Sequence, residues 1–510
     1  MTAPVGRPAS LHSWHDDWRG LRVAVLGLGK TGFSVADTLT ELGASCLVLG
    51  EGEDPERERV LAVLGVPVRI GPLDRAPEEL IRHEPELVVA SPGFPPHHPL
   101  LRWAEETGVP VWGDVELAWR LRDKLGEAAP WLCVTGTNGK TTTTRLTAHM
   151  CAAGGLRAAP CGNIGVPVLD AIRDPQGFDV LVVECSSYQL HATRSLRPHA
   201  SVVLNIADDH LDWHGSAEAY RAAKGRVYEG VRLACVYNTA DAATRELVER
   251  AEVTEGARAI GFTLGVPGPS ELGVVEGILV DRAFLADRHS SALELTTLER
   301  LAQSGLAAPH LVQDVLAAAA LARSLDVPPA AIREALAGFR LDAHRNELVL
   351  REGGRSWVDD SKATNPHAAD ASLRAYPSVV WILGGLLKGV DLAPLVAAHR
   401  QRLRAAIVLG RDREPVLAAF RQHASGVPVI EIDVPETEGV MERAVAEAAA
   451  LATAGDTVLL APAAASMDQF DSYADRGERF ARAVRAQRGE GADDPKPAAG
   501  ADAQRGDATA

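Results

Sequence analysis

Short apolar runs, each followed by a glycine-rich or polar turn and then by residues of helical spacing, repeat along most of the chain. Residues 21–43 show this order, and the apolar run at 132–134 leads through another glycine turn to a predicted helix start at 140. Uninterrupted apolar runs are typical of strands that are buried on both faces of a parallel sheet. The pattern therefore predicts an α/β fold with open, mostly parallel sheets.

Changes in this pattern divide the chain into segments. A glycine-rich, acidic stretch at 255–300 predicts short strands and hairpins, and a helix at 116–129 closes the first group of elements. The strand-then-loop pattern resumes after 340. We predict a flexible N-terminal arm at 1–20, a Rossmann-like domain at 21–129, a central P-loop ATPase-like domain at 130–340, a C-terminal Rossmann-like domain at 341–488 and a disordered tail at 489–510.

The chain has 510 residues and a formal net charge of −16. This acidity argues against nucleic acid as a bulk partner, although a local phosphate pocket is compatible with it. The six cysteines show no two-residue spacing, which predicts reduced, buried thiols instead of a zinc site or a disulfide framework. Because the chain has neither an apolar signal region nor a membrane-length apolar run, we expect a cytoplasmic location without membrane insertion.

The stretch WLCVTGTNGKTTTT at 131–144 has the order of a phosphate-binding loop. Its glycines let backbone N–H groups converge on phosphate oxygens, and a lysine and a threonine hydroxyl can meet the phosphates and a magnesium ion. The loop is shorter than the common form, with two residues where that form has four before the glycine-lysine pair. Expected nucleotide contacts are Gly136, Thr137, Asn138, Gly139, Lys140, Thr141 and Thr142.

A second glycine turn, with Gly27, Gly29 and Gly32, follows the first predicted strand. The spacing G-x-G-x-x-G occurs in dinucleotide-binding folds, but Gly50 stands where such a fold places an acid after the second strand. Lys30 inside the turn favours a phosphate ligand, so we expect a diphosphate-bearing substrate here in preference to a nicotinamide cofactor. The proline-rich loop at 91–94 could be either a rigid connector or part of this site.

Ligand-type side chains follow two later strands of the central domain. Glu184 ends one apolar run, and Asp208, Asp209 and His210 follow the next. A glutamate alone could cap a helix, but acids at two strand ends beside a phosphate loop favour one magnesium site. Lys224 lies in a helical stretch, where a solvated surface lysine is the usual interpretation.

A dense polar cluster occupies 359–365 in the third domain, and Lys388 follows the next predicted strand. Lys362 and Lys388 could be solvated loop lysines. Two lysines at neighbouring strand ends more plausibly stabilise charge that is transferred in a reaction.

The segments GTNGKTTTT, ECSSYQL, NIADDHLDWHG, HR, DDSKATNP and APAAASMDQF occur in this order along the chain. Together they closely resemble the Mur ligases of peptidoglycan synthesis, over about 21–488. GLGKTG, DDSKATN and SMDQF look most like the members that add D-glutamate to UDP-N-acetylmuramoyl-L-alanine. The resemblance implies a monomer that uses ATP and two Mg²⁺ ions to phosphorylate the substrate carboxylate, after which the D-glutamate amine attacks the acyl phosphate.

The resemblance also implies roles for individual residues. Lys140, Glu184, His210 and Lys224 should be catalytic. One metal ion should bind Thr141 and Glu184 and the other His210, with Lys224 as a carbamylated metal ligand. The expected further ATP contacts are His310, Asp314, Arg345 and Asp360. The expected contacts to the UDP-muramoyl substrate are Leu28, Gly29, Lys30, Thr31, Gly32, Phe33, Ser91, Gly93, Asn163, Ser186 and Tyr188, and those to D-glutamate are Lys362, Thr364, Lys388, Ser466 and Tyr473.

The sequence departs from the family pattern at a few positions. The HNxxN element of the family is PHLVQD here, so Leu311 and Asp314 replace its two asparagines. Tyr473 replaces a phenylalanine, and Gly50 removes an expected acid near the uracil contacts. Another Mur ligase and a folylpolyglutamate synthetase-like ligase are the nearest alternatives. A nicotinamide oxidoreductase with a fused P-loop, or a non-catalytic nucleotide-binding scaffold, would be a different class.

Overall fold

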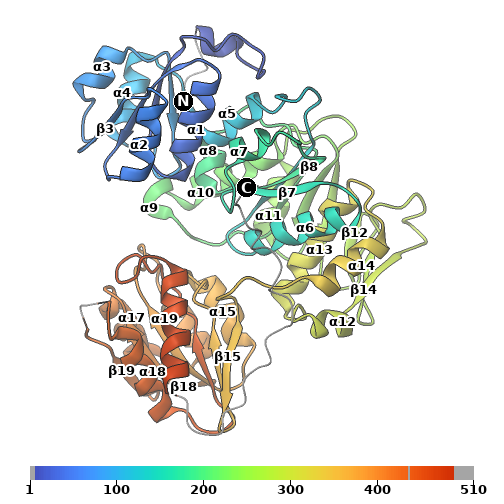
Figure 1. The fold of residues 1–510 in the computed structure, drawn as a ribbon. Helices are drawn as coiled ribbons and strands as arrows, with labels where there is room; N and C mark the ends of the chain where they lie inside the picture. Colours follow the sequence, from blue (N-terminus) through green and yellow to red (C-terminus); the bar gives the residue numbers. More distant parts are fainter. Residues whose placement is uncertain (1–5, 435–436, 488–510) are drawn as a thin grey trace, which may run out of the picture. The chain divides into compact units, whose positions relative to one another are not determined.

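The structure is a computed structural model in which residues 6–434 and 437–487 are described (Figure 1). It divides into two compact units between Leu341 and Asp342. Each unit is built mainly from parallel strands with helices packed on the sheets, so the predicted α/β class is confirmed.

The first sheet has the parallel order β3-β2-β1-β4-β5. Its strands are β1 (Arg22–Leu26), β2 (Ser45–Gly50), β3 (Val68–Ile70), β4 (Leu87–Ala90) and β5 (Val111–Gly113). Its helices are α1 (Lys30–Glu41), α2 (Pro55–Val63), α3 (Glu78–His83), α4 (Pro99–Thr107) and α5 (Asp114–Arg120). The strand order reverses between β1 and β4, and ligands of open α/β sheets bind at such a point. The helix expected over 116–129 is shorter and ends at Arg120.

The described part of the predicted N-terminal arm, 6–20, is packed on this domain, so the expectation of a flexible arm is wrong for these residues. After the short helix η1 (Arg7–Ser10), Leu11 and Trp18 are 3% and 1% exposed. Arg120 donates a hydrogen bond to the carbonyl oxygen of Leu11 over 2.7 Å. Two isolated apolar anchors have no periodicity from which burial could be predicted.

The central sheet has the order β14-β13-β12-β11-β10-β9-β6-β8-β7. Its strands are β6 (Trp131–Thr135), β7 (Ala158–Gly162), β8 (Val180–Glu184), β9 (Ala200–Val203), β10 (Ala234–Asn238), β11 (Arg258–Phe262), β12 (Glu271–Val275), β13 (Ile278–Asp281) and β14 (Leu293–Thr297). Antiparallel pairing of β12 with β13 and of β13 with β14 confirms the hairpins predicted for 255–300.

Helices cover the central sheet and join it to the first one. They are α6 (Lys140–Ala153), α7 (Val168–Ile172), α8 (Ser187–His191), α9 (Leu211–His214), α10 (Ala217–Gly225), η2 (Arg226–Tyr228), α11 (Ala242–Glu249), α12 (Leu298–Gln303), α13 (Pro309–Arg323) and α14 (Pro329–Gly338). Trp119 after β5 and Trp131 on β6 pack edge to face, with ring centroids 5.1 Å apart. One apolar core therefore continues from the first sheet to the central one.

The second unit has the sheet order β15-β16-β20-β17-β18-β19, in which only the pairing of β15 with β16 is antiparallel among the described strands. Its strands are β15 (Glu347–Glu352), β16 (Arg355–Asp359), β17 (Val379–Gly384), β18 (Leu403–Leu409), β19 (Val429–Glu431) and β20 (Thr457–Leu460). Its helices are α15 (Pro366–Arg374), α16 (Ala393–His399), α17 (Arg413–His423), α18 (Val440–Leu451) and α19 (Tyr473–Ala486). The tail predicted at 489–510 lies outside the described residues.

All six cysteines lie in the described residues, and each is a buried free thiol, as the sequence predicts. Among the helices that the structure describes, none has both the length and the apolar character needed to cross a membrane.

Candidate active site

The predicted phosphate loop lies between strand β6 of the central sheet and the start of α6. Gly139 caps the helix with a positive φ of 85°. A Cβ atom at this position would lie 2.2 Å from Oδ1 of Asp314 on α13. Only glycine satisfies both the backbone conformation and the close approach, and the start of a helix such as α6 is a place where backbone N–H groups can bind an anion.

Three side chains brace this loop. Asn205 accepts a hydrogen bond from the backbone N–H of Asn138 at 2.9 Å and donates one to its carbonyl oxygen at 3.1 Å. The hydroxyl groups of Thr137 and Tyr220 lie 2.9 Å apart, and Tyr220 is 1% exposed. We did not single out Asn205 and Tyr220 from the sequence. The position of Asn205 directly after a buried strand was the one available signal.

Two lysine amines converge on one backbone oxygen of the loop. Lys140 Nζ donates to the carbonyl oxygens of Gly136 and Thr137 at 3.0 and 2.9 Å. Lys224 Nζ donates to the carbonyl oxygen of Gly136 at 2.7 Å, and this side chain is only 2% exposed. The interpretation of Lys224 as a solvated surface lysine is therefore wrong. Burial, and secondarily the charge of Lys140, holds the pKa of Lys224 well below its usual value.

Glu184 ends β8 beside the loop and is 1% exposed. Its Oε1 accepts a hydrogen bond from Nδ2 of Asn163 at 2.9 Å. Its Oε2 is buried and has no hydrogen-bond partner among the described residues. A buried carboxylate oxygen without a partner is costly unless a cation or a donor approaches it, and oxygen atoms are the ligands that Mg²⁺ prefers. Together with the Thr141 hydroxyl group in the first turn of α6, this donor set fits a magnesium ion.

His210 lies in the segment between β9 and α9, with a positive φ of 54°. Its Nδ1 is hydrogen-bonded to the hydroxyl group of Tyr188, and its Nε2 lies 3.5 Å from Oδ2 of Asp209. Tyr188 also stacks on Trp213, with ring centroids 4.4 Å apart. The imidazole orientation is therefore fixed by an aromatic group and an acid.

The predicted substrate turn leads directly into α1. Gly29 caps α1 without a side-chain cap, so backbone N–H groups remain available to a phosphate. A Cβ at Gly32 would lie 1.9 Å from the carbonyl oxygen of Gly27, which fixes glycine there. Across the turn, a Cβ at Gly27 would lie 2.6 Å from Oγ of Ser91. The 91–94 loop therefore touches the turn. Leu28, Lys30, Thr31, Phe33 and Gly93 lie in the same two segments, while Ser186 is the N-cap of α8.

In the second unit, hydrogen bonds bring the predicted D-glutamate residues to one edge of the sheet. The backbone N–H of Ala463 donates to the carbonyl oxygen of Ala363 at 2.9 Å. Leu386 and Ala465 exchange backbone hydrogen bonds of 2.9 and 3.0 Å. These contacts join the loops that carry Thr364, Lys388 and Ser466. Lys362 Nζ lies 4.8 Å from the ring centroid of Tyr473.

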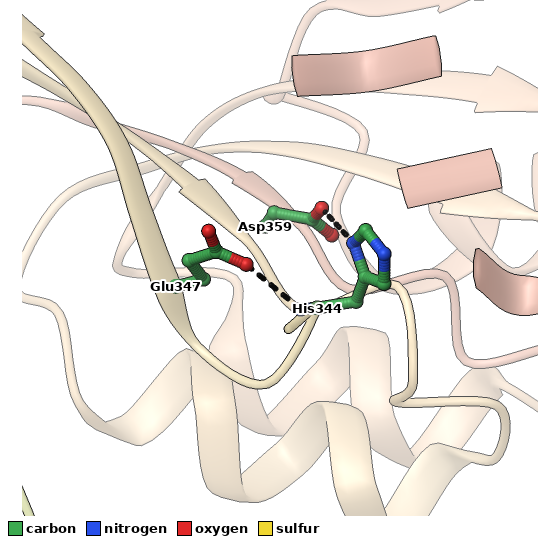
Figure 2. A group of neighbouring side chains, drawn as sticks. All are labelled: His344, Glu347 and Asp359. Atoms are coloured by element: carbon green, nitrogen blue, oxygen red, sulfur yellow. Dashed lines mark hydrogen bonds and ion pairs between the residues drawn. The ribbon is translucent and has the colours of Figure 1, made fainter. Parts of the chain in front are cut away.

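The candidate ATP contacts of this unit, Arg345 and Asp360, directly follow His344 and Asp359 in the sequence. Figure 2 shows His344 and Asp359 together with Glu347. His344 Nδ1 lies 2.7 Å from Oδ2 of Asp359, and its backbone N–H donates to Oε2 of Glu347 at 2.9 Å. Asp359 raises the pKa of His344 by this hydrogen bond, and burial raises the pKa of Asp360 to about 6. The three side chains lie close enough together to hold a metal ion, but the Nδ1 and Oδ2 atoms already satisfy each other. We therefore interpret the hydrogen bonds of His344 with Asp359 and Glu347 as contacts that hold the turn carrying Arg345 in place.

Leu311, which stands in place of the family's first asparagine, is part of the apolar core. Leu311, in the first turn of α13, is 5% exposed and packs with the core of the central sheet. His310 precedes it, and Asp314 adjoins Gly139 as described above.

A short phosphate loop with an acid at the neighbouring strand end defines a P-loop nucleotide-binding α/β protein. Family models place it more closely: the Mur ligase MurD-like N-terminal domain matches 21–113, the Mur ligase middle domain 134–322, and the Mur ligase glutamate ligase domain 344–464. The chain belongs to the Mur ligase family.

Individual relatives agree with this assignment. The chain is 63% identical to the UDP-N-acetylmuramoylalanine--D-glutamate ligase of Leifsonia xyli subsp. xyli, over 97% of this chain and 98% of that protein. It is 55% identical to the enzyme of the same name from Streptomyces avermitilis, over 92% of this chain and 99% of that protein. The crystal structure of a UDP-N-acetylmuramate-alanine ligase from Thermotoga maritima shares the fold, with a TM-score of 0.53 and 19% identity over 92% of this chain and 100% of that one.

Proposed function

We propose that this protein is an ATP-dependent ligase that joins D-glutamate to UDP-N-acetylmuramoyl-L-alanine in cytoplasmic peptidoglycan precursor synthesis. The relatives that match almost the whole chain carry the name of this activity. The geometric observation that carries the proposal is the unpartnered buried Oε2 of Glu184 beside the phosphate loop. An ATP site with a magnesium ligand is the first requirement of such a reaction.

In the proposed reaction, a carboxylate oxygen of the alanyl group attacks the γ phosphorus of ATP, and ADP leaves. The amine nitrogen of D-glutamate then attacks the acyl carbon, loses its proton and expels inorganic phosphate. Lys140 and the N–H groups at the start of α6 hold the β and γ phosphates. For this, Lys140 Nζ exchanges the carbonyl oxygens of Gly136 and Thr137 for phosphate oxygens.

Thr141, Glu184 and His210 would hold Mg²⁺, with Lys224 as a further ligand in carbamylated form. Bound magnesium neutralises phosphate charge and polarises the phosphoryl oxygen. A lysine reacts with carbon dioxide as the neutral amine, and the lowered pKa of Lys224 favours that form. The carbamate is an anion with oxygen ligands, which suits a position next to a metal ion.

D-glutamate would bind in the second unit through Lys362, Thr364, Lys388, Ser466 and Tyr473. Two carboxylates require cations and hydroxyl donors, which these residues provide. Arg345 and Asp360 would hold ATP from the same unit, with His310 and Asp314 on α13 as further contacts. The UDP end of the substrate would lie at Leu28–Phe33 and at Ser91 and Gly93, and its muramoyl part would lie at Asn163, Ser186 and Tyr188.

We further propose that the enzyme acts as a monomer with three functional domains at 21–129, 130–340 and 341–488. The three sheets support this division.

The test is phosphate release with UDP-N-acetylmuramoyl-L-alanine, ATP, Mg²⁺ and a panel of amino acids. The proposal predicts release with D-glutamate, and none above background with L-alanine or diaminopimelate. Release with either of the other amino acids alone would assign the chain to another Mur ligase activity.

A further inference from the structure

One face of α1 carries polar side chains that reach α7. Ser34, Asp37 and Glu41 lie three and four residues apart, so they share one side of the helix. Helices α1 and α7 lie side by side in the first unit (Figure 1). The same helix α1 begins in the glycine turn at 27–32, where we place the diphosphate. A helix of the first sheet that leads to a proposed ligand is therefore in contact with a helix of the central sheet.

Two residues of the α7 segment make this contact. Arg173, the C-cap of α7, has its Nη1 2.5 Å from Oδ2 of Asp37 and its Nε 2.8 Å from Oε2 of Glu41. Ser34 is 2% exposed, and its hydroxyl group donates to Oδ1 of Asp170 at 2.5 Å. The Arg173 side chain is 21% exposed, so its ion pairs are partly shielded from solvent. We call these five side chains the α1–α7 network.

The other end of α7 is joined to the proposed muramoyl side of the site. The 163–167 loop leads into α7, and Asn163 donates to Glu184 from its backbone N–H and from Nδ2, both at 2.9 Å. A Cβ at Gly162 would lie 2.4 Å from the carbonyl oxygen of Glu184, so the start of the loop is packed closely against the end of β8. Helix α7 therefore connects the α1–α7 network to the strand end that carries the proposed magnesium ligand.

The UDP-muramoyl substrate would touch both ends of this connection. In the proposed function its diphosphate lies at the start of α1 and its muramoyl part lies at Asn163. Covalent bonds limit the distance between these two parts of the substrate. Both parts can bind at full strength only when the separation of the two protein segments matches that distance. The ion pairs of Arg173 oppose a shift of α1 along α7 that would change this separation.

We propose that Arg173 and Asp170 are positioning residues for the UDP-muramoyl substrate, because they hold the diphosphate turn of α1 at a fixed distance from Asn163. This inference rests on the proposed function. The two residues act through the placement of α1 and not through contact with the substrate. The proposed contacts of ATP and D-glutamate include no residue of α1 or α7. The affinity for these two substrates should therefore not depend on the α1–α7 network.

The experiment measures steady-state phosphate release and determines KM for each of the three substrates. Arg173→Ala should raise KM for the UDP substrate roughly fivefold or more and leave kcat and the other two KM values within about twofold. Arg173→Lys keeps a cation near Asp37 and Glu41 and should recover part of the loss. Arg157→Ala is the matched control, since Arg157 pairs with Asp174, beyond α7, at 3.1 Å and should leave every value unchanged.

The outcomes separate the two proposals. Absence of phosphate release by the wild-type enzyme with D-glutamate overturns the proposed function and this inference with it. Normal wild-type turnover overturns the positioning role alone if Arg173→Ala leaves KM for the UDP substrate unchanged, or if its effect extends equally to all three KM values.

Folding of the variant is not expected to obscure the result. Glu41 keeps its ion pair with Lys124, at 2.5 Å, when Arg173 is removed. If Arg173→Ala nevertheless does not fold, Ser34→Ala decides, because it removes only the hydrogen bond to Asp170. It should raise KM for the UDP substrate roughly twofold or more, and an unchanged KM would contradict the positioning role.

Discussion

Lys224 Nζ lies 2.7 Å from the carbonyl oxygen of Gly136 and donates a hydrogen bond to it, which fastens the phosphate loop to α10 through a buried amine. Lys140 Nζ donates to the same oxygen at 3.0 Å. Burial disfavours the charged amine, and the nearby cation of Lys140 adds to this effect, so the pKa of Lys224 falls. The lowered pKa of Lys224 favours the neutral amine on which the proposed carbamate depends.

Replacing Lys224 with alanine should slow turnover by roughly 10²- to 10³-fold, a loss typical of removing one electrostatic group from an active site. Added short carboxylates should restore part of the rate by replacing the carbamate. Arg221→Ala, an exposed change on the same helix, is the control and should retain the wild-type rate. Steady-state phosphate release measures all three, and an undiminished rate for Lys224→Ala would refute the metal-ligand role.

Glu184→Gln should raise the Mg²⁺ concentration required for half-maximal rate by roughly 10- to 100-fold, because an amide is a poorer magnesium ligand than the unpartnered carboxylate oxygen. A magnesium titration of the rate measures this change. Glu218→Gln, at an exposed position of α10, should leave the titration unchanged. An unaltered titration for Glu184→Gln would mean that Glu184 does not bind the ion.

Gly139→Ala should prevent ATP binding and destabilise the protein, because the new Cβ would lie 2.2 Å from Asp314 Oδ1 in addition to the strain of a positive φ. Gly155→Ala is the matched control, since Gly155 has a φ of +88° and no atom within 4 Å of the Cβ position. The control should cost only about 1–2 kcal/mol of unfolding free energy, the strain of a left-handed residue. Denaturant unfolding and ATP titration compare the variants. Equal losses of unfolding free energy in Gly139→Ala and Gly155→Ala would show that the close approach of Asp314 is not what requires glycine at position 139.

Arg476 on α19 is fully buried and donates to the side chain and carbonyl oxygen of Ser361 at 3.0 and 2.8 Å. Arg476→Met should therefore lower the unfolding free energy of the second unit by about 2–4 kcal/mol, since it leaves buried acceptors unpaired. Arg479→Met breaks a partly exposed pair with Asp475 on the same helix and should cost at most about 1 kcal/mol. Denaturant unfolding measures the unfolding free energy of both variants. Equal losses would contradict a stabilising role for the buried hydrogen bonds between Arg476 and Ser361.

Asp114 predicts a pH dependence of stability. Burial raises its pKa from 3.8 to about 6, so the folded protein favours the protonated carboxyl group. This contribution to stability is complete below the unfolded pKa and is lost as the pH rises through about 6. Relative to Asp114→Asn, the wild-type protein should lose about 2 kcal/mol between pH 4 and pH 7. Denaturant unfolding of both proteins at several pH values measures the difference, which a normal pKa would leave constant.

The features that were easiest to predict from the sequence are those that depend on residues close together in the chain. The phosphate loop at 136–140 depends on its own glycines, and the strands before it depend on continuous apolar runs, so both were predictable. Burial of a single polar side chain depends on residues that are distant in sequence. Lys224 and Arg476 therefore look like surface residues in the sequence, and contacts with Gly136 and Ser361 give them their roles.

The burial of the N-terminal segment was not predictable either, because it depends on residues that are distant in sequence. Leu11 and Trp18 bury themselves against the first domain without a periodic pattern, so the segment was expected to be flexible. Conversely, the family resemblance supplied proposed roles that no local pattern contains, such as that of Lys224 as a metal ligand. Asn205 was not predicted from the sequence, because its hydrogen bonds to Asn138 form only when the segment after β9 and the phosphate loop lie side by side.

The central claim is that the phosphate loop delivers the γ phosphoryl group of ATP to a carboxylate and not to water. The most direct measurement uses UDP-N-acetylmuramoyl-L-alanine whose alanyl carboxylate is labelled with ¹⁸O, and determines the isotope in the phosphate released with D-glutamate. An acyl phosphate intermediate predicts that one labelled oxygen appears in each phosphate. Unlabelled phosphate formed together with the amide product would contradict the account.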